Sequence, residues 1–406
     1  MVKRQLNKVE LLAPSGDLKR CKTAIRYGAD AVYIGGQSFS LRSRASNFSL
    51  EEIKEACLFA KEYGAHIHVT VNAIHHDEDL EGIEDYLRAL EEIGVTAIIV
   101  ASPYVMQLAK KVAPKLEVHS STQMSVTSHQ AAQFLIDHFQ VDRIVLAREC
   151  SLNDVRRICE TCPKDIEAFI HGGMCVNYSG RCTLSNRMTL RDANRGGCAQ
   201  SCRWQYHLYQ GKDEVSDGAD FTMGSKDLCA ALQIKDLMDA GVKSFKIEGR
   251  MKTEYYVATI VNAYRNLIDD LCNKDELSEE ELEYHLREIR YAENRDTASG
   301  FYEKEAGEES IIYHATSNVD VNHDFLAVVR KYDETTHTAL IEVRNVFSKG
   351  ERIEVLSPRK KVLSFIVEEA KDEEGLSLER MNHPMQLVEI KVPFALKEED
   401  ILRRAR

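Results

Sequence analysis

The sequence has no long apolar segment. Its 406 residues contain no run of about 18 uncharged apolar side chains, the length that spans a membrane as a helix. The first residues, Met1 to Glu10, are polar and lack the apolar core of a secretory signal peptide. We therefore expect a cytoplasmic protein without a membrane-spanning segment.

Net positive charge is also missing. The chain has 53 Lys and Arg residues against 65 Asp and Glu residues, which gives a formal net charge of −12. A protein that coats nucleic acid non-specifically needs a basic surface, so this class is excluded. An RNA partner would have to be met by a local positive patch.

Several common catalytic and cofactor motifs are absent. No GxGxxG follows the first predicted strand, which argues against a dinucleotide-binding domain. The sequence has no GxSxG elbow, no HExxH helix and no obvious Cys/His dyad. The chemistry of the usual hydrolases therefore finds little support in the sequence.

The first two thirds of the chain alternate between short β-branched apolar runs and amphipathic stretches. The eight predicted strands are Val9 to Ala13, Ala31 to Gly35, His66 to Ala73, Ala97 to Ala101, Leu116 to Ser120, Arg143 to Ala147, Ile166 to His171 and Lys243 to Glu248. Eight βα units in roughly 260 residues are typical of a closed (β/α)8 barrel. The predicted fold class is therefore α/β, with a TIM-like barrel over residues 1–272.

The last third of the chain has a different pattern. Residues 273–320 include a highly charged helical stretch, Asp275 to Asp296, which we interpret as a linker or bracing helix. Five short alternating runs follow in residues 321–406, separated by turns, and they predict a small antiparallel β-barrel domain. The five runs are Phe325 to Lys331, Thr338 to Arg344, Arg352 to Leu356, Val362 to Glu368 and Gln386 to Val392. Such a domain could bind nucleic acid or serve as a structural module.

A cysteine-rich loop, residues 172–229, interrupts the βα spacing. It holds Cys175, Cys182, Cys198 and Cys202, and Cys229 follows at the start of a helix expected near Lys226. Thiolate-rich sites bind zinc or iron-sulfur clusters. The irregular spacings Cx6C, Cx15C and Cx3C fit a cluster better than the compact knuckles of structural zinc. Cysteines elsewhere in the chain are interpreted as core residues.

Polar residues gather where the predicted strands end, and in (β/α)8 barrels this end carries the chemistry. Glu149 and Glu248 are the candidate acid or base. The candidate substrate-binding residues are Arg42, Arg44, Asn72, His119, Arg148, His171 and Arg250. The cysteine-rich loop adds five arginines and one acid between residues 171 and 206, which implies an anionic substrate, RNA or a small polycarboxylate. Each of these residues could instead cap a strand or pair with an acid elsewhere.

Several stretches of this sequence resemble the signature of the U32 peptidase family. They are Glu10 to Gly16 (ELLAPSG), Glu167 to Cys175 (EAFIHGGMC), Gly180 to Ser185 (GRCTLS), Gly197 to Trp204 (GCAQSCRW), Ser225 to Cys229 (SKDLC) and Lys246 to Lys252 (KIEGRMK). The resemblance covers nearly the whole predicted barrel, and the terminal β domain looks like the family's C-terminal domain. Within the family, the sequence is most similar to the tRNA hydroxylation (TrhP-like) subgroup.

The resemblance implies an oxygen-independent hydroxylation of the wobble uridine in a tRNA anticodon loop to 5-hydroxyuridine. It also implies a [4Fe-4S] cluster, prephenate as a small anionic hydroxyl donor, and a paralogue as a possible partner. The implied cluster ligands are Cys175, Cys182, Cys198 and Cys229, with Cys202 as an alternative to Cys229. A peptidase of the collagenase-like kind and a metal-stabilised module that binds RNA or a protein partner remain the alternative functions.

Overall fold

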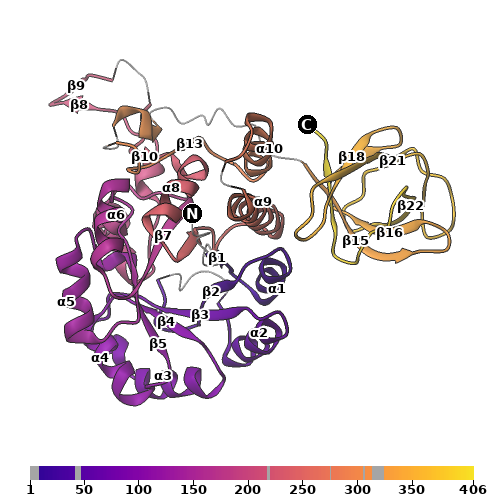
Figure 1. The fold of residues 1–406 in the computed structure, drawn as a ribbon. Helices are drawn as coiled ribbons and strands as arrows, with labels where there is room; N and C mark the ends of the chain where they lie inside the picture. Colours follow the sequence, from indigo (N-terminus) through magenta and orange to yellow (C-terminus); the bar gives the residue numbers. More distant parts are fainter. Residues whose placement is uncertain (1–8, 42–46, 217–219, 275, 305–306, 313–323) are drawn as a thin grey trace.

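Eight parallel strands close into a barrel in the computed structural model, which describes residues 9–41, 47–216, 220–274, 276–304, 307–312 and 324–406 (Figure 1). The strands are β1 (Glu10–Pro14), β2 (Ala31–Gly35), β3 (His66–Val71), β4 (Ala97–Val100), β5 (Glu117–Ser120), β6 (Arg143–Val145), β7 (Asp165–Gly172) and β12 (Ser244–Ile247). Each pairs in parallel with the next, and β12 closes the ring by pairing with both β7 and β1. The predicted (β/α)8 barrel is confirmed.

Helices surround the strands in sequence order (Figure 1). They are α1 (Leu18–Arg26), α2 (Leu50–Glu62), α3 (Ile83–Glu92), α4 (Pro103–Val112), α5 (His129–Phe139), α6 (Leu152–Thr161), α8 (Ile234–Ala240) and α9 (Glu254–Asn273). A capping box at Ser49 and Glu52 begins α2, because each side chain bonds to the backbone N–H of the other residue. Among the described residues, no helix is long and apolar enough to cross a membrane.

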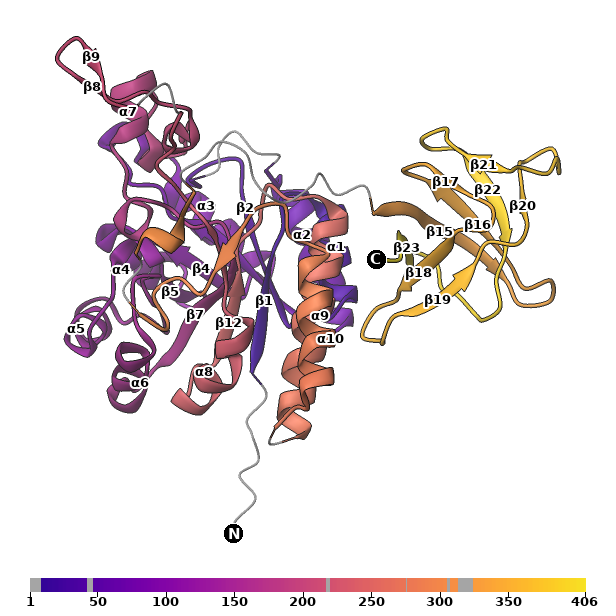
Figure 2. The ribbon, with the colours of Figure 1, turned by 90° about the horizontal axis from the view of Figure 1, so that it is seen from above.

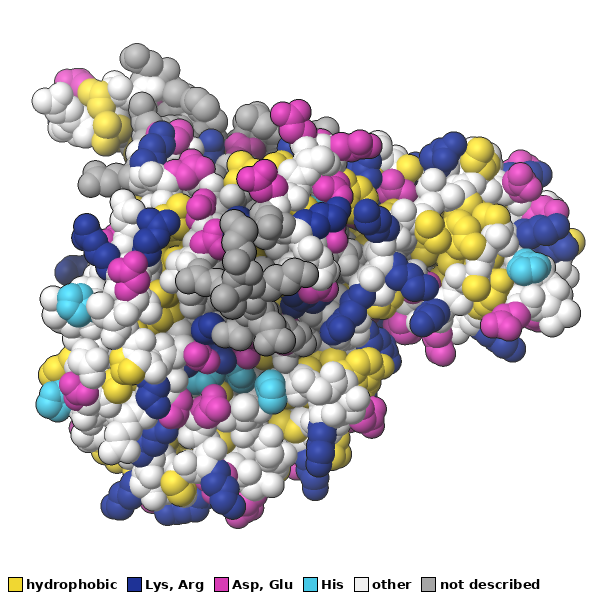
Figure 3. Space-filling view, in the orientation of Figure 1, with side chains coloured by type: hydrophobic (Ala, Val, Ile, Leu, Met, Phe, Trp, Pro, Cys, Tyr) yellow, Lys and Arg dark blue, Asp and Glu magenta, His cyan; other side chains and the backbone are white. Residues whose placement is uncertain are grey.

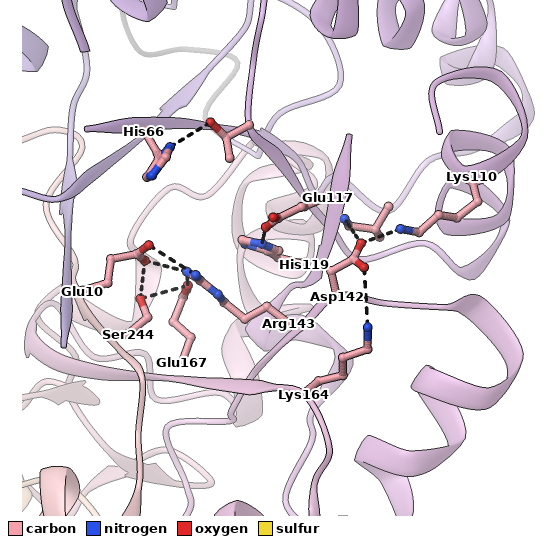
Figure 4. A network of polar contacts seen from close by, with 12 residues as sticks. Glu10, His66, Lys110, Glu117, His119, Asp142, Arg143, Lys164, Glu167 and Ser244 are labelled. Atoms are coloured by element: carbon pink, nitrogen blue, oxygen red, sulfur yellow. Dashed lines mark hydrogen bonds and ion pairs between the residues drawn. The ribbon is translucent and has the colours of Figure 1, made fainter. Parts of the chain in front are cut away.

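The floor of the barrel, at the N-terminal ends of the strands, contains a network of charged side chains (Figure 4). Arg143 donates to Glu10 at 2.5 Å and to Glu167 at 3.2 Å, and the hydroxyl of Ser244 donates to both carboxylates. Lys246 donates to the other oxygen of Glu167 at 2.8 Å. Glu167 is fully buried, and the charges of Lys246 and Arg143 lower its pKa to about 2 although burial opposes this.

The cysteine-rich loop covers the opposite end of the barrel, away from the N-terminus (Figure 2). It contains helix α7 (Leu184–Thr189) and the hairpin β8 (Tyr209–Gln210) and β9 (Asp213–Glu214), followed by β10 (Gly224–Ser225) and β11 (Asp227–Cys229). The helix expected near Lys226 is therefore wrong. This stretch is β11, which pairs antiparallel with the end of β7, and the next α-helix, α8, begins only at Ile234.

The segment between the two domains contributes to the mouth of the barrel as well as to the linker. Helix α10 (Glu279–Arg290) lies within the predicted charged helix and packs beside α9. After it, β13 (Thr297–Ala298) pairs with β11, and β14 (Ile311–Ile312) pairs with β10. Residues after α10 thus join the barrel sheet next to the cysteine-rich loop.

The C-terminal domain is an antiparallel sheet with the order β19-β18-β23-β15-β16-β22-β20. Its strands are β15 (Phe325–Asp333), β16 (Thr338–Val343), β18 (Arg352–Leu356), β19 (Leu363–Ile366), β20 (Ala370–Lys371), β22 (Leu387–Lys391) and β23 (Ile401–Arg404), with a separate pair of β17 (Phe347–Ser348) and β21 (Arg380–Met381). All five predicted runs are strands. The sequence prediction missed β23, which pairs with both β15 and β18 near the middle of the sheet.

The C-terminal domain packs against α1, α9 and α10 (Figure 2). The centre of this contact is Arg403, whose guanidinium donates to Glu288 of α10 and to Glu354 of β18 at 2.7 Å each and lies over the ring of Tyr291. The hydroxyl of Tyr27 donates to the carbonyl of Leu356. The buried, paired guanidinium fixes the domain beside the barrel helices.

Candidate functional site

A cavity of about 280 Å³ opens at the C-terminal ends of the barrel strands. Its floor includes Tyr33, Thr70 and Phe169, and its upper wall comes from the cysteine-rich loop, including Cys175, Cys198 and Cys202. Five cations, Arg148, Arg203, Lys246, Arg250 and Arg295, line it together with two acids, Glu149 and Glu248. A small anion would find more positive than negative charge there.

Four cysteine side chains of the loop lie within electrostatic range of one another. Burial raises the pKa of Cys175, and the neighbouring Cys182 and Cys198 raise it further. Burial also raises the pKa of Cys202, with added contributions from Cys175, Cys198 and Cys182. Cys182 is buried, and Asn194 holds its backbone by accepting from its N–H and donating to its carbonyl. The structure thus brings Cys175, Cys182, Cys198 and Cys202 into one group.

Cys229 lies apart from that group. It is on β11, and its sulfur is 3.8 Å from the hydroxyl of Tyr264 on α9. Burial raises its pKa, and the charged side chains that act on it are Glu293 and Arg290 rather than other cysteines. Cys229 lines a separate cavity of about 340 Å³ beside α10.

The four grouped cysteines match an iron-sulfur cluster in the number and softness of their donors. Within the part of the chain that the structure describes, no three His, Cys, Asp or Glu side chains converge closely enough to form a preformed metal site. Gly180 and Gly196, each within two residues of a loop cysteine, have positive φ angles of 74° and 92°, which glycine adopts without strain. The chemistry of the donor set fits a cluster.

Arg148 and Arg250 line the cavity, as predicted for substrate-binding residues. Arg148 lies 3.9 Å from the ring centroid of Phe169 and donates to the carbonyl of Gly173 at 3.0 Å. Arg250 is buried and donates to Ser40 at 3.0 Å, Thr70 at 3.2 Å and Asn47 at 2.9 Å. Its guanidinium passes so close to Gly35 that a Cβ there would lie 2.0 Å from it.

The two predicted acid or base residues also line the cavity. Glu149 accepts from the backbone N–H of Ser179 at 2.7 Å, and thereby holds the loop between Cys175 and Cys182. Glu248 follows β12, and its carboxylate lies beside Gly173, where a Cβ would be 3.3 Å from it. Glu149 therefore has a clear role in loop structure, and Glu248 lies at the cavity wall beside Gly173.

The other residues predicted to bind substrate lie in different parts of the structure. Asn72 lines the cavity, and its side chain accepts from the N–H of Leu41 at 3.3 Å. Arg42 and Arg44 lie outside the described residues. His119 is buried in the barrel interior in a lower layer, 3.0 Å from Glu117 (Figure 4), and its ring lies edge-on to that of His68.

His171 points away from the cavity. It packs between β7 and α9, with Nδ1 3.2 Å from the hydroxyl of Tyr264. Burial and the charge of Lys252 lower its pKa to about 3, so the ring is neutral. Of the described residues that line the cavity, none is a histidine, which leaves the cysteines there without an imidazole base.

Three further charged residues lie at the mouth; the sequence indicated Arg203, as one of the five loop arginines, but Lys246 and Arg295 were missed. Lys246 lines the cavity floor, and Arg203 and Arg295 line its wall. The last two lie 3.4 Å and 3.7 Å from the buried carboxylate of Asp227. A charged side chain inside a predicted barrel strand, as at Lys246, was the available signal, because such strands are otherwise apolar.

Comparison with known proteins places the chain in a family. The profile described as Peptidase family U32 matches residues 16–312, and that of the Peptidase family U32 C-terminal domain matches residues 321–403. The chain belongs to peptidase family U32. The chain is 44% identical over 407 residues to tRNA hydroxylation protein P1 of Bacillus subtilis. The match covers 98% of this chain and 95% of that protein.

Two further U32 relatives have different names. The chain is 43% identical over 263 residues to the 23S rRNA 5-hydroxycytidine synthase of Escherichia coli, covering 65% of this chain and 40% of that protein. It is 36% identical over 326 residues to a Methanocaldococcus jannaschii protein named an uncharacterized protease, covering 78% and 75%. The names of relatives in this family therefore refer to RNA hydroxylation and to proteolysis.

Proposed function

We propose that this U32 protein is an RNA hydroxylase that converts the wobble uridine of tRNA to 5-hydroxyuridine, with prephenate as the hydroxyl donor. The observation that carries the proposal is the mouth cavity, which combines cysteine thiols with an excess of cations in one space. The names of the Bacillus subtilis and Escherichia coli relatives support an RNA substrate. We expect the protein to act in the cytoplasm, where tRNA is available.

The proposed cofactor is a [4Fe-4S] cluster held by Cys175, Cys182 and Cys198 with one further thiol. The grouping of the side chains favours Cys202 as the fourth ligand over Cys229. Cys202 lines the mouth cavity together with Cys175 and Cys198, whereas Cys229 lies beside Tyr264 and lines a different cavity. When bound, such a cluster would supply one-electron chemistry at the barrel mouth. The cationic lining would offset the negative charge of the thiolates.

The residues of this chain bind and orient the small anion in this scheme. Arg148 and Arg250 are suited to carboxylates because a guanidinium presents two parallel donors. Glu248 would hold or move a proton at its carboxylate. Glu149 would position the cysteine-rich loop through its bond to the Ser179 backbone.

The RNA substrate would approach over the cysteine-rich loop. Figure 3 shows the opposite face of the barrel, at the N-terminal ends of the strands, where Lys and Arg side chains are interspersed with Asp and Glu. A second cavity of about 190 Å³ shares Glu149, Met174 and Cys175 with the first and is lined by Tyr178 and Phe301. A base turned out of an anticodon loop could stack against such rings.

Deletion of the gene and complementation test the proposal. We expect wobble 5-hydroxyuridine, measured by mass spectrometry of digested tRNA, to disappear on deletion and to return with the wild-type gene. A Cys175→Ala copy should not restore it, whereas a Cys57→Ala copy, changed at a cysteine of α2 far from the loop, should. Unchanged 5-hydroxyuridine in the deletion strain would refute the proposed reaction, and loss shared with a second U32 gene would identify the paralogue partner.

Proteolysis is the second candidate function, and the name of the Methanocaldococcus jannaschii relative favours it. The cavity holds cysteines but none of its described lining residues is a histidine that could activate them. We therefore expect purified protein to leave collagen and casein uncleaved. Cleavage that a Cys175→Ala change abolishes would favour the peptidase.

A further inference from the structure

Lys246 is an amine placed inside the mouth cavity. It lies on β12, its side chain is only 5% exposed, and it contributes to the cavity lining. Its Nζ is 4.7 Å from the ring centroid of Tyr33, 5.4 Å from that of Phe169 and 2.8 Å from a carboxylate oxygen of Glu167. The nitrogen is therefore held in a fixed position between two aromatic rings and one acid.

The surroundings of Lys246 lower the pKa of its ammonium group. Burial lowers its pKa, and the charges of Arg143 and Arg148 lower it further, while Glu167 acts in the opposite direction. Lysines in such surroundings serve as nucleophiles toward carbonyl groups. Glu248 lines the same cavity and could accept the proton that the amine must lose before it attacks.

The cavity also offers a partner for a carboxylate beside this amine. The guanidinium of Arg148 lies over the ring of Phe169, the same ring that Lys246 approaches. A molecule that carries a carboxylate next to a ketone could therefore bind Arg148 and present its carbonyl carbon to Lys246. This is the arrangement of a 2-oxo acid.

We propose that Lys246 forms an imine with the ketone of a 2-oxo acid bound in the mouth cavity. The inference rests on the proposed function, because the proposed donor, prephenate, carries a ketone next to a carboxylate. It goes further by assigning a covalent step to one residue.

The step balances without an added oxidant or reductant. The amine nitrogen forms a bond to the carbonyl carbon, the carbonyl oxygen leaves as water, and the product is a protonated imine. One proton leaves the ammonium group before attack and returns to the leaving oxygen or the imine nitrogen. The protonated imine keeps the positive charge of Lys246, so the buried carboxylate of Glu167 retains its partner.

Reductive trapping tests the proposal on the full-length protein. Purified protein is incubated with phenylpyruvate and sodium cyanoborohydride, and the adduct is located by intact mass and peptide mapping. We expect one reduced adduct per chain, on Lys246, and none with phenyllactate, which lacks the ketone. The same result with pyruvate would extend the site to 2-oxo acids generally.

Two variants control the experiment. Lys246→Arg keeps a cation beside Glu167 and should abolish the adduct. Lys252→Arg should leave it unchanged: burial also lowers the pKa of Lys252, but this lysine lies over the Tyr256 ring and is not among the lining residues of the cavity. The mapped position in the wild-type protein remains decisive if Lys246→Arg folds poorly.

The outcomes separate this inference from the proposed function. Absence of an adduct, or adducts spread over exposed lysines, would overturn the imine, whether or not tRNA hydroxylation is found. A Lys246 adduct in a protein whose deletion leaves 5-hydroxyuridine unchanged would support the imine and overturn the RNA reaction.

Discussion

The two ends of the barrel interior carry charge differently. At the floor, Arg143 donates to both Glu10 and Glu167 (Figure 4), and Lys246 donates to Glu167, so two cations and two acids balance within one network. At the mouth, the four arginines that line the cavity, Arg148, Arg203, Arg250 and Arg295, outnumber the two acids that line it. Paired charges in a packed interior need no further ligand, whereas an excess of one sign around a cavity favours a ligand of the opposite sign. The floor therefore supports the fold, and the mouth is where we expect a substrate to bind.

The largest expected effect on stability comes from disrupting the network of charged side chains at the floor of the barrel. Glu167→Gln leaves Arg143 and Lys246 buried without their shared carboxylate. We expect the free energy of unfolding to fall by about 3 kcal/mol or more. Urea unfolding followed by circular dichroism measures it, with Glu160→Gln, at an exposed position of α6, as the control. A change below about 1 kcal/mol would show that the floor network does not hold the barrel.

A smaller effect concerns the pH dependence of stability through His171. Its pKa is about 3 in the folded protein because of burial, against the ordinary value of 6.5. The unfolded chain therefore takes up a proton first, and stability falls as the pH drops from 6.5 toward 3. At pH 5 this histidine should cost the wild-type protein about 2 kcal/mol relative to pH 8, a loss that His171→Phe avoids.

Unfolding free energies of both proteins at pH 8 and pH 5 measure this difference, and other titrating groups cancel in the comparison. Equal losses in wild type and His171→Phe would mean that His171 is charged in the folded state and faces solvent or a partner acid.

A substitution at the mouth should change the affinity for a ligand rather than the stability of the fold. Arg148→Met removes a guanidinium from the cavity but leaves the floor network intact. We expect the affinity for phenylpyruvate, measured by calorimetry, to fall about tenfold, which is about 1.4 kcal/mol. The free energy of unfolding should change by less than about 1 kcal/mol. Arg156→Met, at an exposed position of α6, is the matched control, and equal affinities for both variants would contradict the assigned carboxylate site.

The smallest expected effect is at the rim. Arg187 on α7 is exposed, and none of the ion pairs found among the described residues includes it. Arg187→Ser should weaken tRNA binding by about 1 kcal/mol or less and reduce its salt dependence by about one counterion. Arg88→Ser, on α3 and already paired with Glu84, should leave binding unchanged. The same affinity and salt slope for both variants would place the RNA elsewhere.

The barrel was predictable from sequence because its strands are buried on both faces. Strands such as β2 and β4 are continuous apolar runs, and their bounds match the prediction to within one residue. The short strands β11 and β13 carry no such signal, since two or three residues pair only because the tertiary structure brings them together. Strand β23 was missed because its inward Arg403 looks like a surface residue until its acidic partners are known.

The candidate site was predictable only in part. Arg148, Arg250, Asn72 and both glutamates line the cavity because they follow the strand ends, as the general rule for such barrels predicts. His171 does not, because a register shift between β7 and β12 pairs it with Ile247, whereas an unbroken register would pair it with Glu248. Sequence spacing likewise could not show that Cys202, and not Cys229, lies near the other three loop cysteines.

The most direct test of the account is the iron and sulfide content of protein purified without oxygen, together with its electron paramagnetic resonance spectrum. We predict about four irons per chain, lost in alanine variants of Cys175, Cys182, Cys198 and Cys202 and kept in Cys229→Ala. Zinc in place of iron, no metal at all, or iron that survives Cys175→Ala would contradict the assignment of the mouth as a redox site.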